Sequence, residues 1–379
     1  MDDCKKRTWA EIDLSAIEDN VRSMKSKLPA GCRFLGVVKA DAYGHGAVPV
    51  AKRLEQYGAD YLAVACIDEA EELRAAGVRL PILIFGATAA DYAVQLAELG
   101  VTQAVSSLEM ARAFSEKLAA AGKTLRVHLK LETGMGRTGF DVKRGDVADA
   151  VEAVRLPGLD PEGVFTHFAV SDEPARAGCD AYTQKQFQIF TDAIASIERE
   201  AGLKFRIRHC TNSGAMVNYP AFCLDMVRPG IDLYGLYPGA ERGEVTLRPA
   251  MALRSRIAAV TEHEAGDAIS YGCTFTAQRK IRLAVVPIGY ADGLHRALSG
   301  KIEVLIHGVR CRQVGRICMD MCMVDVTDVP DVREGDTATI FGTDGSESIS
   351  VDELAEKAGT ISYEILCAVS QRVPRVYLG

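Results

Sequence analysis

The chain has 379 residues, which is more than one ordinary domain contains and predicts two or three domains, or one large barrel with an appendage. Apolar residues make up 48% and charged residues 25%, the balance of a globular protein with a sizeable core. The formal net charge of −7 argues against a general binder of nucleic-acid backbones.

Short strand-like runs alternate with helical patterns through the first part of the chain. Several runs are almost continuously apolar, as is typical of parallel strands that are covered on both faces. This alternation favours a (β/α)8 TIM-like barrel over residues 1–243 rather than an open, doubly wound sheet. The predicted strands are 34–38, 61–65, 81–85, 102–105, 125–131, 162–168, 206–210 and 225–234. The predicted helices include 47–57, 68–76, 89–99, 108–121 and 182–201.

Beyond residue 243 the pattern changes to short strand-like runs separated by turns, with one helical pattern near 351–358. This texture predicts an all-β domain over residues 244–379. Its predicted strands are 253–260, 281–288, 302–306, 309–315, 322–326 and 337–342. The segment 8–14 also alternates, and it is expected to pair with one of the two domains, the β domain being one candidate.

Several features predict a cytoplasmic protein that contacts neither membrane nor nucleic acid. No apolar run approaches the ~18 residues of a membrane span, and residues 1–6 are polar, unlike a signal peptide. The eleven cysteines contain no C-x-x-C pair, which indicates reduced thiols. The histidines and cysteines show no metal-ligand spacing, so no metal is expected.

Polar side chains follow the ends of the predicted barrel strands, where the active sites of such barrels lie. Lys39 follows a buried-looking run, and an amine that loses water there becomes a nucleophile towards an aldehyde; the alternative is a lysine that reaches solvent. The segments 212–214, after strand seven, and 230–231, within strand eight, fit a phosphate cradle, or else an ordinary turn and helix cap. The other strand-end candidates are Lys130, Arg137, His167 and Arg228.

The glycines of 134–139 formally match G-x-G-x-x-G. They lead into Phe140-Asp141-Val142, and helical periodicity begins only near residue 146, whereas a dinucleotide fingerprint must open its helix directly. We therefore predict a glycine-rich barrel loop that presents Arg137.

Nine blocks of sequence, in order along the chain, resemble the bacterial alanine racemases, which are fold-type III pyridoxal-phosphate enzymes. The first is VVKADAYGHG at 37–46, the cofactor-lysine signature. The others are HLKLETGMGRTG (128–139), THFA (166–169), NSGA (212–215), VRPGIDLYGLYP (227–238), SYGCTFTA (270–277), PIGYADG (287–293), VGRICMDM (314–321) and SYEILC (362–367). The family fold is a (β/α)8 barrel followed by a β domain.

The resemblance implies a role for each matched residue. Lys39 would bind pyridoxal 5'-phosphate covalently and act as one catalytic base, and Tyr271, supplied by the second subunit of a homodimer, would act as the other. Arg228 would contact the pyridine nitrogen, with His167 beside the ring. The implied cofactor-binding residues also include Tyr43, Asn212, Ser213, Gly230, Ile231 and Tyr363. Arg137 and the backbone N–H of Met319 would receive the substrate carboxylate, with Asp320 nearby. Lys130 matches a lysine that is carbamylated in some members, and Arg296, Arg316 and Ile361 match an access channel.

The function that the resemblance implies is interconversion of L-alanine and D-alanine, which would supply D-alanine for peptidoglycan. Three alternatives remain open on the sequence alone. One is a serine or broad-specificity amino-acid racemase on the same scaffold, the second is a fold-type III decarboxylase, and the third is a non-catalytic protein that binds the cofactor.

Overall fold

The computed structural model describes residues 7–379, and the polar N-terminal segment 1–6 lies outside the described residues. Contacts within the chain divide it into two compact units. One, here called the barrel unit, comprises Ile17–Ala42 and Ala47–Arg248. Among the described residues, the other, the strand-rich unit, comprises 7–16, Tyr43–Gly46 and Pro249–Gly379.

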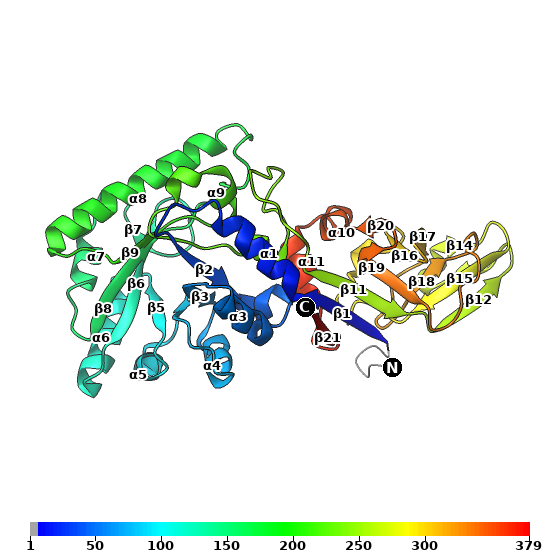
Figure 1. The fold of residues 1–379 in the computed structure, drawn as a ribbon, viewed down its shortest axis with the longest axis horizontal. Helices are drawn as coiled ribbons and strands as arrows, with labels where there is room; N and C mark the ends of the chain where they lie inside the picture. Colours follow the sequence, from blue (N-terminus) through cyan, green and yellow to red (C-terminus); the bar gives the residue numbers. More distant parts are fainter. Residues whose placement is uncertain (1–6) are drawn as a thin grey trace. The chain divides into compact units, whose positions relative to one another are not determined.

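The barrel unit is built on eight parallel strands in the order β10-β2-β3-β4-β5-β6-β8-β9 (Figure 1). The first and last strands of this order are joined by two backbone hydrogen bonds, Asp225 N–H to Arg208 O (3.0 Å) and Arg228 N–H to Thr211 O (2.9 Å). The sheet therefore forms a nearly closed barrel, which confirms the predicted fold class. The strands are β2 (Arg33–Val37), β3 (Tyr61–Val64), β4 (Ile82–Ile84), β5 (Thr102–Val105), β6 (Leu125–Glu132), β8 (Leu159–Phe165), β9 (Ile207–His209) and β10 (Met226–Val227), with the short β7 (Phe140–Asp141) beside β6.

Helices follow the strands and cover the outside of the barrel, with the long α8 running along one side (Figure 1). Their ends use ordinary capping chemistry: Ser107 Oγ accepts the N–H of Met110 at the start of α6, and Gly122 ends that helix in the left-handed conformation. The helices are α1 (Leu14–Lys25), α2 (Lys39–Tyr43), α3 (Ala47–Gln56), α4 (Ile67–Ala75), α5 (Ala93–Glu98), α6 (Leu108–Ala121), α7 (Ala148–Ala153), α8 (Cys179–Ala201) and α9 (Ser213–Asn218). Among the residues from 7 onwards, no helix is long and apolar enough to cross a membrane.

In the strand-rich unit, the N-terminal strand β1 (Thr8–Asp13) pairs antiparallel with β11 (Met251–Arg256) and parallel with β21 (Arg375–Leu378). The alternating segment near the N-terminus is thus held in the sheet of this unit. The remaining strands are β12 (Ala259–His263), β13 (Ala268–Ile269), β14 (Phe275–Thr276), β15 (Ile281–Val286), β16 (Glu303–Ile306), β17 (Val309–Val314), β18 (Cys322–Asp325), β19 (Thr337–Asp344) and β20 (Glu347–Ile349). Two helices, α10 (Val351–Ala358) and α11 (Ser362–Ala368), complete the unit.

The prediction of an eighth barrel strand over 225–234 is wrong in its length. The strand β10 covers only Met226–Val227, and Ile231–Tyr234 is the 3₁₀ helix η4. Pro229 has no N–H to continue a ladder, so the strand ends before it. Gly230 and Ile231 consequently follow the strand rather than lying within it.

Three further differences concern the predicted strands 253–260 and 162–168 and one helix. The predicted strand 253–260 is two strands, β11 and β12, because the N–H of Ile257 bonds Asp336 O while that of Ala258 bonds Val285 O. The predicted strand 162–168 is β8 (Leu159–Phe165), so His167 lies two residues beyond the end of the strand rather than within it. The helix α11 was not predicted.

Candidate active site

Lys39 is the first residue of a left-handed turn that follows β2. The four residues after it, Ala40, Asp41, Ala42 and Tyr43, have φ values of 53, 52, 53 and 54°. Residues with a Cβ adopt this region at a cost of roughly 1–2 kcal/mol each, and strain of this kind is concentrated at functional sites. The chain therefore changes direction sharply immediately after Lys39.

Two carboxylates hold this turn in place. Glu69 accepts the N–H of Ala40 through one oxygen (2.6 Å) and that of Ala65 through the other (2.6 Å). Asp41 accepts the N–H of Ala47 (2.7 Å), the first residue of α3, where a negative charge is favourable. The strained conformation is therefore fixed by neighbours on both sides.

Four cations of the barrel unit lie within electrostatic reach of one another. Burial, followed by the positive charges of Arg137, Arg228 and Lys39, lowers the pKa of Lys130 to about 8. The Lys130 amine is almost buried and donates a hydrogen bond to Thr138 Oγ1 (2.6 Å). Burial and the same group of cations also hold the pKa of His167 well below its usual range. These strand-end residues thus converge on one strongly positive region.

The glycine-rich loop after β6 is organised by Glu132. Its carboxylate accepts the backbone N–H groups of Gly134 (2.5 Å), Gly136 (3.0 Å) and Arg137 (3.2 Å). The loop then enters the short strand β7 (Phe140–Asp141) instead of a helix. This agrees with the prediction of a barrel loop and not with a dinucleotide fingerprint, which would open a helix directly. The geometry of the loop presents the exposed Arg137 side chain at the strand end.

Arg228 is buried at 4% exposure, and both terminal nitrogens of its guanidinium have neighbours within hydrogen-bond distance. One terminal nitrogen lies 3.0 Å from His209 Nδ1; the other donates to Thr166 O (2.8 Å) and Cys210 O (3.2 Å) and lies 3.4 Å from His167 Nδ1. Burial lowers its pKa to about 10, so it stays charged at neutral pH. A guanidinium held in this way is a fixed donor.

A line of buried side chains continues from Arg228 across the barrel. His209 Nε2 lies 2.8 Å from His128 Nδ1, and His128 Nε2 lies 3.4 Å from a carboxylate oxygen of Glu162. That oxygen also accepts the hydroxyl of Tyr61 (2.7 Å). Burial opposes ionisation of Glu162, but hydrogen bonds from His128 and Tyr61 keep its pKa at about 2. The negative charge nearest to Arg228 along this line is therefore two imidazoles away.

The predicted phosphate-binding residues come together after β9 and β10. Asn212 caps the short helix α9 by accepting the N–H of Ala215 (3.0 Å). Ser213 Oγ accepts the N–H of Gly230 (2.9 Å) and is hydrogen-bonded to Asp232 Oδ1 (2.7 Å). This contact joins the two segments through one hydroxyl.

The other candidate residues belong to the strand-rich unit. The rings of Tyr43 and Tyr363 lie side by side, with centroids 5.9 Å apart. Tyr271, in the 3₁₀ helix η5 (Tyr271–Cys273), is 69% exposed and lines a groove of about 650 Å³. Ser270 Oγ donates to the backbone O of Arg316 (2.7 Å), which holds this turn beside the segment that leads to Met319. Arg296 lies in η6 (Arg296–Leu298), and Ile361 precedes α11 at 61% exposure.

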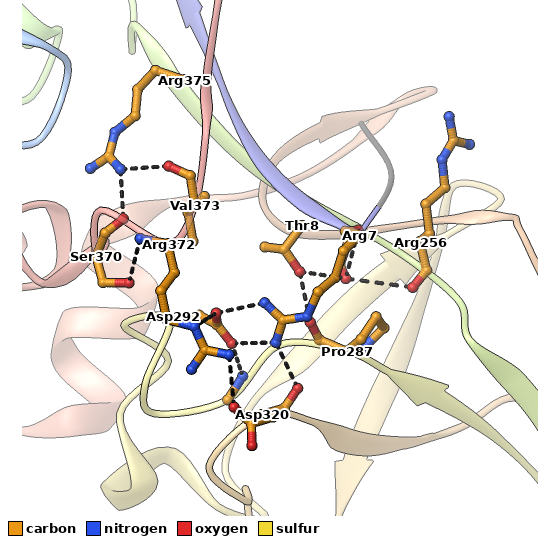
Figure 2. A network of polar contacts seen from close by, with 12 residues as sticks. Arg7, Thr8, Arg256, Pro287, Asp292, Asp320, Ser370, Arg372, Val373 and Arg375 are labelled. Carbon is orange, nitrogen blue, oxygen red and sulfur yellow. Dashed lines mark hydrogen bonds and ion pairs between the residues drawn. The ribbon is translucent and has the colours of Figure 1, made fainter. Parts of the chain in front are cut away.

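The segment with Met319 and Asp320 is held by residues that sequence reasoning missed. Arg7 makes two hydrogen bonds to the buried Asp292 (2.7 and 2.8 Å) and one to the backbone O of Asp320 (2.9 Å). Arg372 donates to the Asp320 carboxylate (2.8 Å) and lies 3.6 Å from Asp292. Figure 2 shows the Arg372 guanidinium directed at both carboxylates, and the Arg7 guanidinium directed at the Asp292 carboxylate and the backbone oxygen of Asp320. Asp292 lies within the PIGYADG block, which was the available signal; nothing local marked the two arginines.

Comparison with known proteins agrees with this architecture. Residues 12–238 match the alanine racemase N-terminal domain, and residues 250–377 match the alanine racemase C-terminal domain. The chain belongs to the alanine racemase family. It is therefore an enzyme of the isomerase class, as predicted.

Similar proteins cover almost the whole chain. The alanine racemase of Desulforamulus reducens is 45% identical over 99% of this chain and 100% of its own length. The solved alanine racemase of Clostridium difficile 630 has a TM-score of 0.92 and 42% identity, covering 98% of this chain and 96% of its own. That of Bacillus anthracis, solved with bound L-Ala-P, has a TM-score of 0.91 and 37% identity, covering 98% of this chain and 95% of its own.

Proposed function

We propose that this enzyme uses pyridoxal 5'-phosphate to interconvert L-alanine and D-alanine with two bases, Lys39 and Tyr271. The observation that carries the proposal is the position of Lys39, on a strained turn at a strand end, within electrostatic reach of Lys130, on which Arg137 and Arg228 also act. The positive charges in this region, that of Lys39 among them, lower the pKa of the Lys130 amine. They also suit anionic ligands such as a phosphate ester and an amino-acid carboxylate.

The residues present fit the cofactor. Arg228 is a charged donor locked by three strand-end acceptors and is suited to a pyridine nitrogen, with His167 beside it. Ser213, the N–H groups near Gly230 and Ile231, and the paired tyrosines Tyr43 and Tyr363 are suited to the phosphate, with Asn212 shaping the turn. When bound, the cofactor supplies an aldehyde for the amine and an electron sink for the substrate α-carbon.

Racemisation requires a proton donor or acceptor on each face of the α-carbon. We assign Lys39 to one face and Tyr271 to the other. Because Tyr271 is 69% exposed on its own unit, a second copy of the chain can receive it, and we propose a homodimer with shared sites. Arg137 and the Met319 N–H, with Asp320 near them, would bind the substrate carboxylate.

The proposed substrate is small. Bulky phenol rings at Tyr271 and Tyr363 leave room for a methyl side chain, and Arg296, Arg316 and Ile361 would line the access channel. We further propose that the enzyme acts in the cytoplasm and supplies D-alanine for peptidoglycan.

The direct test is to incubate purified, pyridoxal-phosphate-loaded protein with L-alanine and to measure D-alanine by chiral chromatography. We expect conversion towards an equal mixture, its loss in Lys39→Ala, and its retention in Lys52→Ala, an exposed lysine of α3. Racemisation of serine but not of alanine would overturn the assignment of alanine as the substrate. Release of carbon dioxide would indicate a decarboxylase, and cofactor binding with no turnover of any amino acid would indicate a binding protein.

A further inference from the structure

A buried carboxylate lies directly beside the proposed phosphate site and has no role in the chemistry described above. Asp232, in η4, is 0% exposed. Its Oδ1 is bonded to Ser213 Oγ (2.7 Å), whereas its Oδ2 has no hydrogen-bond partner within residues 7–379. An ionised carboxylate that is buried with one oxygen unsatisfied is unfavourable, so the group needs either a proton or a donor.

The hydrogen-bonding capacity of Ser213 links this carboxylate to the site. A serine hydroxyl donates one hydrogen bond and accepts two. Its oxygen already accepts the N–H of Gly230 (2.9 Å), and its single proton points to Asp232 when that carboxylate is ionised. A phosphate oxygen that accepts from Ser213 takes this proton away from Asp232. The contact between Ser213 and Asp232 then survives only if Asp232 becomes the donor, and this requires a protonated carboxyl group.

The surroundings of Asp232 favour the same outcome. Burial raises the pKa of Asp232 to about 6, while the hydrogen bond from Ser213 and the nearby backbone N–H groups of Asp232, Gly230 and Leu233 act to lower it. None of these opposing groups is charged. A phosphate placed beside it adds a like charge and disfavours ionisation further.

We propose that Asp232 takes up one proton from solvent when a phosphate group binds beside Ser213, Gly230 and Ile231, so that phosphate binding weakens as the pH rises. The inference rests on the proposed cofactor and names the group that makes its binding depend on pH. In the bound state, the Asp232 carboxyl donates to Ser213 Oγ, and the Ser213 hydroxyl donates to the phosphate.

The direction of the effect follows from proton linkage. Between the pKa of Asp232 in the free site and its higher pKa in the bound site, Asp232 is ionised before binding and protonated after it, so the association constant falls about tenfold per pH unit. Below the pKa of the free site, Asp232 is already protonated and the association constant no longer depends on it. Asp232→Asn removes the dependence, because an amide has the same shape and can donate to Ser213 at every pH.

The test is isothermal titration calorimetry of the cofactor-free dimer or monomer, as purified, with pyridoxine 5'-phosphate, whose alcohol cannot form an imine with Lys39. Titrations between pH 6 and 8.5, in buffers of different ionisation enthalpy, count the protons taken up per ligand bound. We expect the wild type to take up close to one proton more than Asp232→Asn at pH 8, and to bind with a steeper loss of affinity. Asp172→Asn, a carboxylate next to Gly214, is the matched control and should keep the wild-type proton uptake.

Two further probes assign the effect to the phosphate. Inorganic phosphate should show the same difference between wild type and Asp232→Asn, and pyridoxine without phosphate should not. Equal proton uptake by wild type and Asp232→Asn would overturn the inference while leaving the cofactor assignment intact. Absence of binding by every phosphate-bearing probe, including pyridoxal 5'-phosphate, would instead overturn the proposed function.

Discussion

At the scale of one residue, Lys130 is a candidate site residue that lowers the stability of the folded protein. Its pKa is about 8 in the folded chain, below the ordinary 10.5, so the folded state favours the neutral amine. Between these values the unfolded chain binds more protons, and stability rises with pH through the window from about 8 to 10.5. At neutral pH the charged amine therefore destabilises the fold.

We expect Lys130→Met to raise the free energy of unfolding of the cofactor-free protein at pH 7 by about 2 kcal/mol. This is the free energy that corresponds to the lowered pKa of Lys130, reduced by the contribution of the hydrogen bond to Thr138, which the variant loses. The gain should vanish near pH 10. Urea unfolding in buffer free of carbon dioxide, at pH 7 and 9.5, measures both values. Lys143→Met is the control on an exposed lysine. A variant no more stable than wild type at pH 7 would contradict this account of Lys130.

Ala40 gives a second residue-scale prediction. It is exposed and has φ 53°, so glycine should relieve strain there and stabilise the fold by about 1 kcal/mol. Ala120→Gly, at an exposed position in the ordinary helix α6, should instead destabilise it by about 1 kcal/mol. Thermal unfolding of the two variants compares the signs, and destabilisation by both would show that the left-handed turn is not strained.

At the residue scale, sequence reasoning found groups that follow strand ends and missed those that act from a distance. Lys39 and Lys130 stand at the ends of recognisable apolar runs, so the barrel fold alone brings them together. Glu69, which secures the turn behind Lys39, lies on a helix 30 positions along the chain, and its spacing carries no local signal. Contacts of this kind depend on the packed backbone.

At the scale of elements, the segments around Asp292 and Asp320 are held together as a pair by hydrogen bonds and ion pairs (Figure 2). The N–H of Gly289 donates to Asp292 (2.9 Å), and the N–H groups of Tyr290 and Ala291 bond Cys318 O and Met319 O. Arg7 fastens this pair to the strand β1. The segment that would present the Met319 N–H to a carboxylate therefore depends on a buried charge.

We expect Asp292→Asn to destabilise the protein by about 3 kcal/mol, because two guanidinium groups lose a buried counter-charge. In variants that remain folded, the KM for L-alanine should rise more than kcat falls, since the carboxylate-binding segment loses its position. Denaturant unfolding and steady-state kinetics measure the two effects. Asp328→Asn, which removes only an exposed pair with Arg279, should change stability by less than about 1 kcal/mol. A fall in kcat with KM unchanged would argue against a positioning role.

The element boundaries show where patterns fail. The run 225–234 is apolar enough to predict a long strand, yet Pro229 interrupts the ladder, and this residue was the available warning. The division of 253–260 into two strands has no such marker, because both halves alternate and neither glycine nor proline separates them. That division arises from which distant strands pair with residues 257 and 258.

At the scale of the whole molecule, eight strands alternating with helices were sufficient to predict the barrel, and a run of short strands was sufficient to predict the second fold. The partner of β1 was not predictable in the same way. Its alternating residues fit any half-buried sheet edge, and only the folded register shows it between β11 and β21.

Tyr271 carries the last prediction, because the proposed homodimer would place the two bases of one site, Lys39 and Tyr271, on different chains. Lys39→Ala and Tyr271→Phe chains should each be nearly inactive alone. In a mixed dimer, the site that keeps Lys39 receives Tyr271 from the Lys39→Ala chain and is intact, whereas the other site lacks both bases. After random exchange of equal amounts, about one quarter of the wild-type racemase activity should therefore return. Subunit exchange is verified by mass spectrometry of differently tagged chains. Activity that stays at the level of the separate variants after verified exchange would mean that each chain builds its own site.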